Sequence, residues 1–164
     1  MAATHDSAVA AAHPRPDTQR VAGPVLAARY FSAYDGNKDP VEVSYYYDQY
    51  RKHRYSDVLD AKPIDYQVLG VSESKNARLS RYMLLYKGLC LLEDNQPAKA
   101  RGYLDSVWKS AAPADPITFT AQWYSLLAAL RQGDQPGIQD LAGRLIHRPN
   151  PYQERARKIL QELL

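Results

Sequence analysis

This sequence has little of what stabilises small secreted proteins or drives most catalysis. Only one of its 164 residues, Cys90, is a cysteine, so no disulfide can form within the chain. The four histidines are scattered, and no pair has the spacing of metal ligands. A glycine-rich phosphate loop and a nucleophile elbow are also missing. We therefore predict a non-catalytic protein without a metal or other cofactor, in which Cys90, set between leucines, is inert core.

Long apolar runs are missing too. The longest stretch without a charged residue, residues 116–130, includes threonine, glutamine and serine. It falls short of the roughly 18 apolar residues that a membrane-spanning helix needs. Residues 1–12 lack the basic start and long apolar core of a signal peptide. The net charge of +3 is too small to indicate nucleic acid or anionic lipid by itself. We expect a soluble domain with no direct membrane insertion.

Phenylalanine is scarce, whereas tyrosine is abundant: the chain has 2 of the former and 13 of the latter. Tyrosine suits positions where the ring is packed and the hydroxyl group is wet. This bias favours half-buried surfaces and grooves.

The chain divides into two parts of different composition. Residues 1–23 contain no aromatic residue, leucine or isoleucine, so they bury too little apolar surface to offset the entropy of ordering. We predict a disordered tail or linker over residues 1–23 and one helical domain over residues 24–164.

Within that domain, apolar residues recur at helical spacing and no alternating strand pattern is convincing. Asp39, Asp115 and Asp134 are predicted N-caps, each with a proline one or two residues after it. The predicted helices cover residues 24–34, 40–53, 55–69 (divided near Pro63), 76–93, 97–110, 116–130, 136–146 and 151–164.

Two stretches share one plan. "YKGLCLLEDNQPAKARGYL" (residues 86–104) and "YSLLAALRQGDQPGIQDLA" (residues 124–142) each start with tyrosine, run through apolar residues, break at a Gln-Pro turn and resume at helical spacing. The separation of Tyr86 and Tyr124 gives a period of 38 residues. A degenerate earlier unit is present around "YRKHRYSDVL" (residues 50–59).

This organisation resembles tetratricopeptide repeats, in which helix pairs approach closely at small residues. The matching residues are Tyr86, Gly88, Leu91, Ala100, Leu104 and Pro113 in one unit, and Trp123, Tyr124, Ala128, Gly133, Asp134 and Ile138 in the next. The period exceeds the usual ~34 residues, Ile138 stands where alanine is normal, and Leu126 occupies the glycine position. The resemblance implies a right-handed α-α superhelix of about three helix pairs plus a C-terminal capping helix.

A closer resemblance is to the tetratricopeptide-like C-terminal domains of Bacteroidetes envelope proteins. "RYFSAY" (residues 29–34), "WYSLLAALRQGD" (residues 123–134) and "NPYQERARKILQELL" (residues 150–164) match their motifs in order. This resemblance implies a periplasmic domain behind an anchor that the sequence does not include; without an anchor, we expect it in the cytoplasm.

In tetratricopeptide arrays the first helix of each pair lines a concave groove that holds a peptide. The resemblance therefore implies a scaffold or adaptor that binds a partner protein or peptide, with aromatic and arginine side chains giving specificity. The candidate partner-binding residues are Val43, Tyr47, Tyr50, Arg51, Tyr82, Leu85, Leu89, Glu93, Trp123, Leu127 and Arg131.

Several alternatives stay open. Leu85, Leu89 and Leu127 could simply pack between helices, since large exposed apolar patches are rare on monomers. The chain's own first helix, around Tyr30 and Phe31, could fill the groove. The domain could also be a structural spacer, or a homo-oligomer that self-associates through the groove. Nucleic acid is disfavoured, because Glu154 can pair with Lys158 and basic runs such as "RKHR" (51–54) and the arginines of 144–158 are usually solvated faces.

Overall fold

The computed structural model describes residues 22–64 and 66–163 of the chain. Within these ranges the secondary structure is helical and contains no strand, so the predicted all-α class is confirmed. Of the predicted tail, residues 1–23, the first 21 lie outside the described residues. Gly23 already belongs to the first helix.

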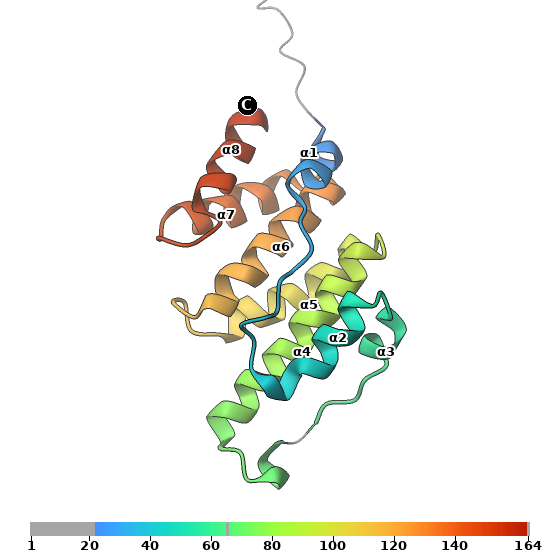
Figure 1. The fold of residues 1–164 in the computed structure, drawn as a ribbon. Helices are drawn as coiled ribbons and strands as arrows, with labels where there is room; N and C mark the ends of the chain where they lie inside the picture. Colours follow the sequence, from blue (N-terminus) through green and yellow to red (C-terminus); the bar gives the residue numbers. More distant parts are fainter. Residues whose placement is uncertain (1–21, 65, 164) are drawn as a thin grey trace, which may run out of the picture.

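The described helices are short before α4 and longer from α4 onwards (Figure 1). Their bounds are α1 Gly23–Tyr30, the 3-10 turn η1 Val41–Val43, α2 Ser44–Arg51, α3 Tyr55–Leu59, the 3-10 turn η2 Tyr66–Leu69, α4 Glu73–Glu93, α5 Pro97–Ser110, α6 Pro116–Gln132, α7 Gln135–Ile146 and α8 Gln153–Leu163.

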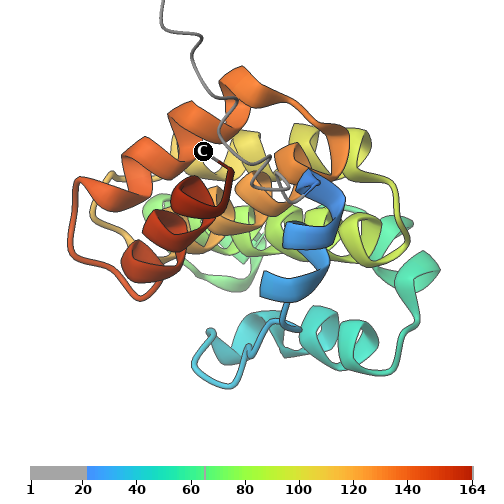
Figure 2. The same ribbon diagram turned by 90° about the horizontal axis from the view of Figure 1, so that it is seen from above.

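Helices α4 to α8 form a succession in which each packs against the one before it. At one end, α2 and α3 pack against α4, while α1 packs against α6 and α8 near the other end. Seen from above, α1 and the segment after it lie on one side of the α4–α7 layer (Figure 2). The chain therefore returns its N-terminal helix to the C-terminal half of the stack.

Helices α4 and α6 are the centre of the core. All residues of α4 from Leu85 to Leu92 are buried, as are all residues of α6 from Thr120 to Leu130. A helix with apolar residues on all sides must have neighbours on all sides, and α4 contacts α2, α3, α5 and α6. The predicted central position of the helix over residues 76–93 is confirmed.

Two of the three predicted N-caps are confirmed. The Asp115 carboxylate accepts a hydrogen bond from the Ile117 amide at 3.1 Å, and the Asp134 carboxylate accepts one from the Gly137 amide at 3.2 Å. Helix α4 begins earlier than predicted, because the Ser72 hydroxyl caps it by accepting from the Lys75 amide. The prediction for Asp39 is wrong: no side chain caps η1 or α2, and the Asp39 carboxylate binds two tyrosine hydroxyl groups instead.

The first helix is shorter than predicted. It ends at Tyr30, because Phe31 adopts an extended backbone with φ −68° and ψ 132°. Residues 31–36 continue without helix or strand, as the thin blue trace from α1 towards η1 and α2 in Figure 1. A helix through Tyr34 would keep its aromatic rings beside α1. The irregular path carries them to rings on α4 and α6 instead.

The close approach of α4 and α5 explains one of the residues that carry the tetratricopeptide resemblance. A Cβ atom on Gly88 would lie 2.6 Å from Leu104 Cγ and 3.3 Å from the Ala100 carbonyl oxygen. Only glycine leaves room for this crossing. Gly133 ends α6 with φ 68°, a conformation that glycine adopts without strain.

Candidate functional site

Five tyrosines from three helices lie around the ring of Tyr34 or beside one another, and we call them the tyrosine surface: Tyr46, Tyr47 and Tyr50 from α2, Tyr86 from α4 and Tyr124 from α6. Tyr86 is at its centre, with the ring centroids of Tyr46, Tyr47 and Tyr50 at 6.0 to 6.4 Å. The spacing of Tyr46 and Tyr50 puts both on the face of α2 that packs on α4. Aromatic pairs at such distances stabilise the fold by more free energy than their buried area alone provides.

Residues 31–39 lie across this surface and are called the covering segment. The Phe31 ring meets Tyr124 edge-on at 6.1 Å, and the Tyr34 ring meets Tyr86 and Tyr124 at 5.8 and 6.2 Å. Gly36 is buried against the same rings: a Cβ on it would lie 2.2 Å from Tyr86 Oη and 2.7 Å from Tyr47 Cδ2. The covering segment therefore packs closely on these rings, and no side chain would fit at position 36.

Tyrosine hydroxyl groups bind the main chain of the covering segment. Tyr124 Oη donates to the Ser32 carbonyl oxygen at 2.8 Å, and the Tyr34 amide donates to Tyr50 Oη at 3.1 Å. Irregular backbone must find hydrogen-bond partners outside regular secondary structure. The tyrosine surface supplies them from two different helices.

Asp39 anchors the end of the covering segment. Its Oδ1 accepts from Tyr34 Oη at 2.7 Å and its Oδ2 accepts from Tyr86 Oη at 2.5 Å. Burial raises the pKa of Asp39, while the two tyrosine hydrogen bonds oppose that rise. Burial and the hydrogen bond to Asp39 hold the pKa of Tyr86 far above its usual range. Both tyrosines therefore act as neutral donors.

Glu93, at the end of α4, is a second acidic anchor. Its carboxylate accepts hydrogen bonds from the hydroxyl groups of Tyr50 and Tyr55. His53 Nδ1 lies 2.7 Å from Tyr55 Oη and 3.9 Å from the Glu93 carboxylate. Burial raises the pKa of Tyr50 and Tyr55. This cluster joins α2, α3 and α4.

Most of the predicted groove residues are not exposed. The buried ones, none more than 6% exposed, are Val43, Tyr50, Tyr82, Leu85, Leu89, Trp123 and Leu127. The prediction that they line an open groove is wrong, because neighbouring helices and the covering segment occupy the space beside them. Trp123, for example, stacks on Tyr152 of α8 at 5.2 Å. One alternative holds: the three leucines are core residues. Another holds in part, because the chain covers its own surface, but with the irregular residues 31–39 and not with the first helix.

Four of the predicted residues keep solvent contact: Tyr47, Arg51, Glu93 and Arg131. Arg131 donates to the Leu92 carbonyl oxygen and its guanidinium lies 5.3 Å above the Phe31 ring, so it helps to hold the covering segment. Burial lowers its pKa. Arg51 is exposed, with its guanidinium 5.5 Å above the Tyr47 ring.

Tyr47, Arg51 and Glu93 belong to one hollow of about 400 Å³, which we call the rim pocket. Its lining residues are Ala33, Tyr34, Asp35, Asn37, Tyr47, Tyr50, Arg51, His53 and Glu93. The covering segment supplies one wall, and α2 with the end of α4 supplies the other. Asp35 and Asn37 were not predicted as site residues, because "DGNKD" (residues 35–39) signalled only a helix stop. His53 was not predicted either, because it is one of four scattered histidines without metal-ligand spacing.

Comparisons with protein-family models, with curated proteins and with solved structures gave no match for this chain. In residues 22–64 and 66–163, no helix combines the length and hydropathy required to cross a membrane. The same residues hold no group of three or more histidine, cysteine, aspartate or glutamate side chains arranged to bind a metal ion.

Proposed function

We propose that this protein is a non-catalytic docking module that binds an extended stretch of a partner protein at the rim pocket. Its helix pairs α2–α3, α4–α5 and α6–α7, followed by α8, are proposed to form a tetratricopeptide-like superhelix. The glycine at the α4–α5 crossing and the contact of α4 with both α5 and α6 support this assignment.

The observation that carries the proposal is that the tyrosine surface already holds an irregular stretch of polypeptide. It does so with rings that pack on side chains and with hydroxyl groups that bind main-chain atoms. Such contacts depend on backbone shape more than on one particular sequence. A surface with this chemistry suits a peptide ligand.

The rim pocket is where that surface stays open. It combines half-buried Tyr47 with exposed Arg51 and His53, and tyrosine and arginine are the residue types enriched at interface hot spots. Arg51 forms no ion pair within the described residues. Its charge is therefore free for a partner's carboxylate, and the Tyr47 ring beneath the guanidinium supports it from below at 5.5 Å.

The acidic groups at this site are already engaged, which favours binding over catalysis. In the rim pocket, Glu93 accepts two tyrosine hydrogen bonds, and Asp35 accepts from the Asn37 amide at 3.0 Å and from the Tyr47 hydroxyl group at 3.3 Å. Asp39, outside the pocket lining, also accepts two tyrosine hydrogen bonds. Cys90 is buried, and burial raises the pKa of its thiol to about 12, so it has almost no thiolate at neutral pH.

The test compares two charge reversals on neighbouring exposed arginines. Arg51→Glu changes the rim pocket, whereas Arg54→Glu changes an exposed arginine outside it. The wild type and both variants would be immobilised and used to capture partners from the source cell, with circular dichroism as a check on folding. We expect Arg51→Glu to lose the captured partner and Arg54→Glu to keep it.

Equal recovery by all three proteins would contradict the assignment of the rim pocket. Light scattering over a concentration series separates a foreign partner from a second copy of the chain. Dimers that Arg51→Glu dissociates would favour the self-association alternative instead. Alanine at buried Tyr50 or Trp123 is unsuitable for this test, because it removes core volume and costs about 3–5 kcal/mol of stability.

A further inference from the structure

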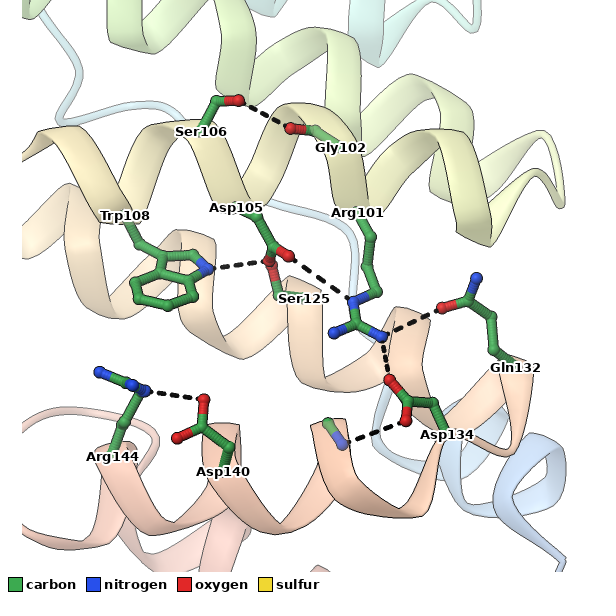
Figure 3. Close-up of polar contacts among 11 residues, drawn as sticks. Arg101, Gly102, Asp105, Ser106, Trp108, Ser125, Gln132, Asp134, Asp140 and Arg144 are labelled. Carbon is green, nitrogen blue, oxygen red and sulfur yellow. Dashed lines mark hydrogen bonds and ion pairs between the residues drawn. The ribbon is translucent and has the colours of Figure 1, made fainter.

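A second polar cluster lies between α5, α6 and α7, on residues separate from the tyrosine surface (Figure 3). Asp105 of α5 accepts hydrogen bonds from Trp108 Nε1 at 2.9 Å and from the buried Ser125 hydroxyl of α6 at 2.8 Å. Arg101 lies 3.8 Å from Asp105 and also pairs with the α7 cap Asp134. This network fixes the orientation of the Trp108 ring.

Cationic side chains gather at the fixed Trp108 ring. The Arg144 guanidinium of α7 lies 4.9 Å from the ring centroid, and Lys109 Nζ lies 5.2 Å from it. Arg144 is held there by Asp140, whose carboxylate accepts from Arg144 Nε at 2.9 Å (Figure 3). Cations over an aromatic face are attracted by its quadrupole.

Beside this ring is a hollow of about 440 Å³, which we call the Trp108 pocket. Trp108 and Phe119 give it an aromatic part, while Lys109, Arg144 and Arg148 give it positive charge. No aspartate or glutamate is among the described residues that line it. Lys109 and Arg148 are exposed and form no ion pair within residues 22–64 and 66–163. The pocket is thus complementary to an anion.

Gln122 of α6 adds an uncharged polar group to the Trp108 pocket. This side chain is 7% exposed, lines the pocket, and forms no hydrogen bond among the described residues. Its amide atoms are not among the buried polar atoms that lack a partner, so they face the hollow and can bind a polar group there. The amide nitrogen can donate two hydrogen bonds, so a carboxylate oxygen is a suitable acceptor.

We propose that the Trp108 pocket binds an acidic peptide segment of a partner protein. A ligand carboxylate would be held by Lys109, Arg148 and the Gln122 amide, and a neighbouring apolar side chain would pack on Trp108 and Phe119. Nucleic acid fits less well, because it needs a row of cations along the phosphate backbone and the whole chain has a net charge of only +3. This inference does not depend on the rim pocket, with which it shares no residue.

Three fluorescein-labelled probes test the proposal by fluorescence anisotropy at low salt: a peptide alternating glutamate and leucine, its glutamine–leucine counterpart, and a single-stranded oligonucleotide. The site variant is Lys109→Gln/Arg148→Gln. The matched control is Lys99→Gln/Arg54→Gln, which removes the same charge at exposed positions outside the pocket.

We expect the full chain to bind the glutamate peptide and neither of the other probes. The site variant should weaken binding by roughly tenfold, while the control stays within about twofold, since each exposed ion pair contributes modestly. Gln122→Leu, which leaves every charge in place, should also weaken binding severalfold. Equal affinity of site variant and control would overturn the proposal. Binding of the oligonucleotide in preference to the glutamate peptide would overturn it too.

Discussion

At the scale of single residues, the α4–α5 crossing depends on Gly88. An added methyl group there would meet Leu104 and the Ala100 carbonyl, so we expect Gly88→Ala to lower the unfolding free energy by about 1–3 kcal/mol. Gly102 is the matched control on α5, because a Cβ there has no neighbour within 4 Å. Gly102→Ala should raise stability by about 0.5–1 kcal/mol through helix propensity. Urea denaturation measures the unfolding free energy of both variants. The same change in unfolding free energy in both would show that α4 and α5 do not approach each other closely at Gly88.

Asp39 and Asp134 should change the pH dependence of the unfolding free energy in opposite directions. Burial raises the pKa of Asp39 above its ordinary 3.8, so its favourable contribution is complete below 3.8 and is lost as pH rises through the folded-state pKa. The Arg101 hydrogen bond lowers the pKa of Asp134, so its contribution is complete above 3.8 and is lost as pH falls through the folded-state pKa.

We therefore expect Asp39→Asn to steepen the loss of stability on acidification just above pH 3.8, and Asp134→Asn to make the loss shallower below it. Asparagine still caps α7 in the second variant. Urea titrations of the wild type and both variants across this pH range measure the slopes. The same change of slope in both variants would contradict the environments described for the two carboxylates.

Cys90 reports on opening of the core. Because its thiol is buried with its pKa raised to about 12, we expect a thiol reagent to modify it only as fast as the protein unfolds. A cysteine placed at exposed Ser106 in a Cys90→Ser background should react at once. Fast modification of Cys90 in the folded wild type would mean that α4 is not central.

At the scale of elements, the covering segment is the feature on which the proposed function most depends. Gly36→Ala should lift it from Tyr86 and Tyr47. We expect faster hydrogen exchange at residues 31–39 and a loss of about 1–3 kcal/mol in unfolding free energy. Lys38→Ala, an exposed change in the same segment, should stay within about 0.5 kcal/mol of the wild type.

Binding gives this variant a second readout. Because the covering segment forms one wall of the rim pocket, Gly36→Ala should also reduce capture of the partner. Increased capture would show instead that the segment competes with the partner for the tyrosine surface, contrary to the proposed docking at the rim pocket.

The sequence predicted helices well where local signals and packing agree. Helix α5 has the predicted bounds, and α6 and α7 follow their predicted caps Asp115 and Asp134. The sequence did not predict the end of α1 at Tyr30. The apolar spacing through Tyr34 is helical, but contacts with Tyr86 and Tyr124, distant in sequence, favour an irregular backbone. Tertiary contacts of this kind have no local signature.

At the scale of the whole molecule, composition indicated the residue type of the site, whereas residue periodicity did not indicate its location. The excess of tyrosine predicted half-buried surfaces and grooves; tyrosines do gather at the site, but four of the five are buried and only Tyr47 is half-buried. The tetratricopeptide pattern assigned Leu85, Leu89 and Leu127 to the groove, because they lie on the first helix of a repeat, but all three are core residues. The path of residues 31–39 decides which side chains stay accessible, and repeat periodicity does not describe that path.

One measurement tests the central claim most directly: nuclear Overhauser contacts of the Tyr34 ring in the isotopically labelled full chain. We predict cross-peaks from Tyr34 to the rings of both Tyr86 and Tyr124, whose centroids lie 5.8 and 6.2 Å away, and from Phe31 to Tyr124. A Tyr34 ring with random-coil shifts and only sequential contacts would contradict the claim that the chain covers its own tyrosine surface.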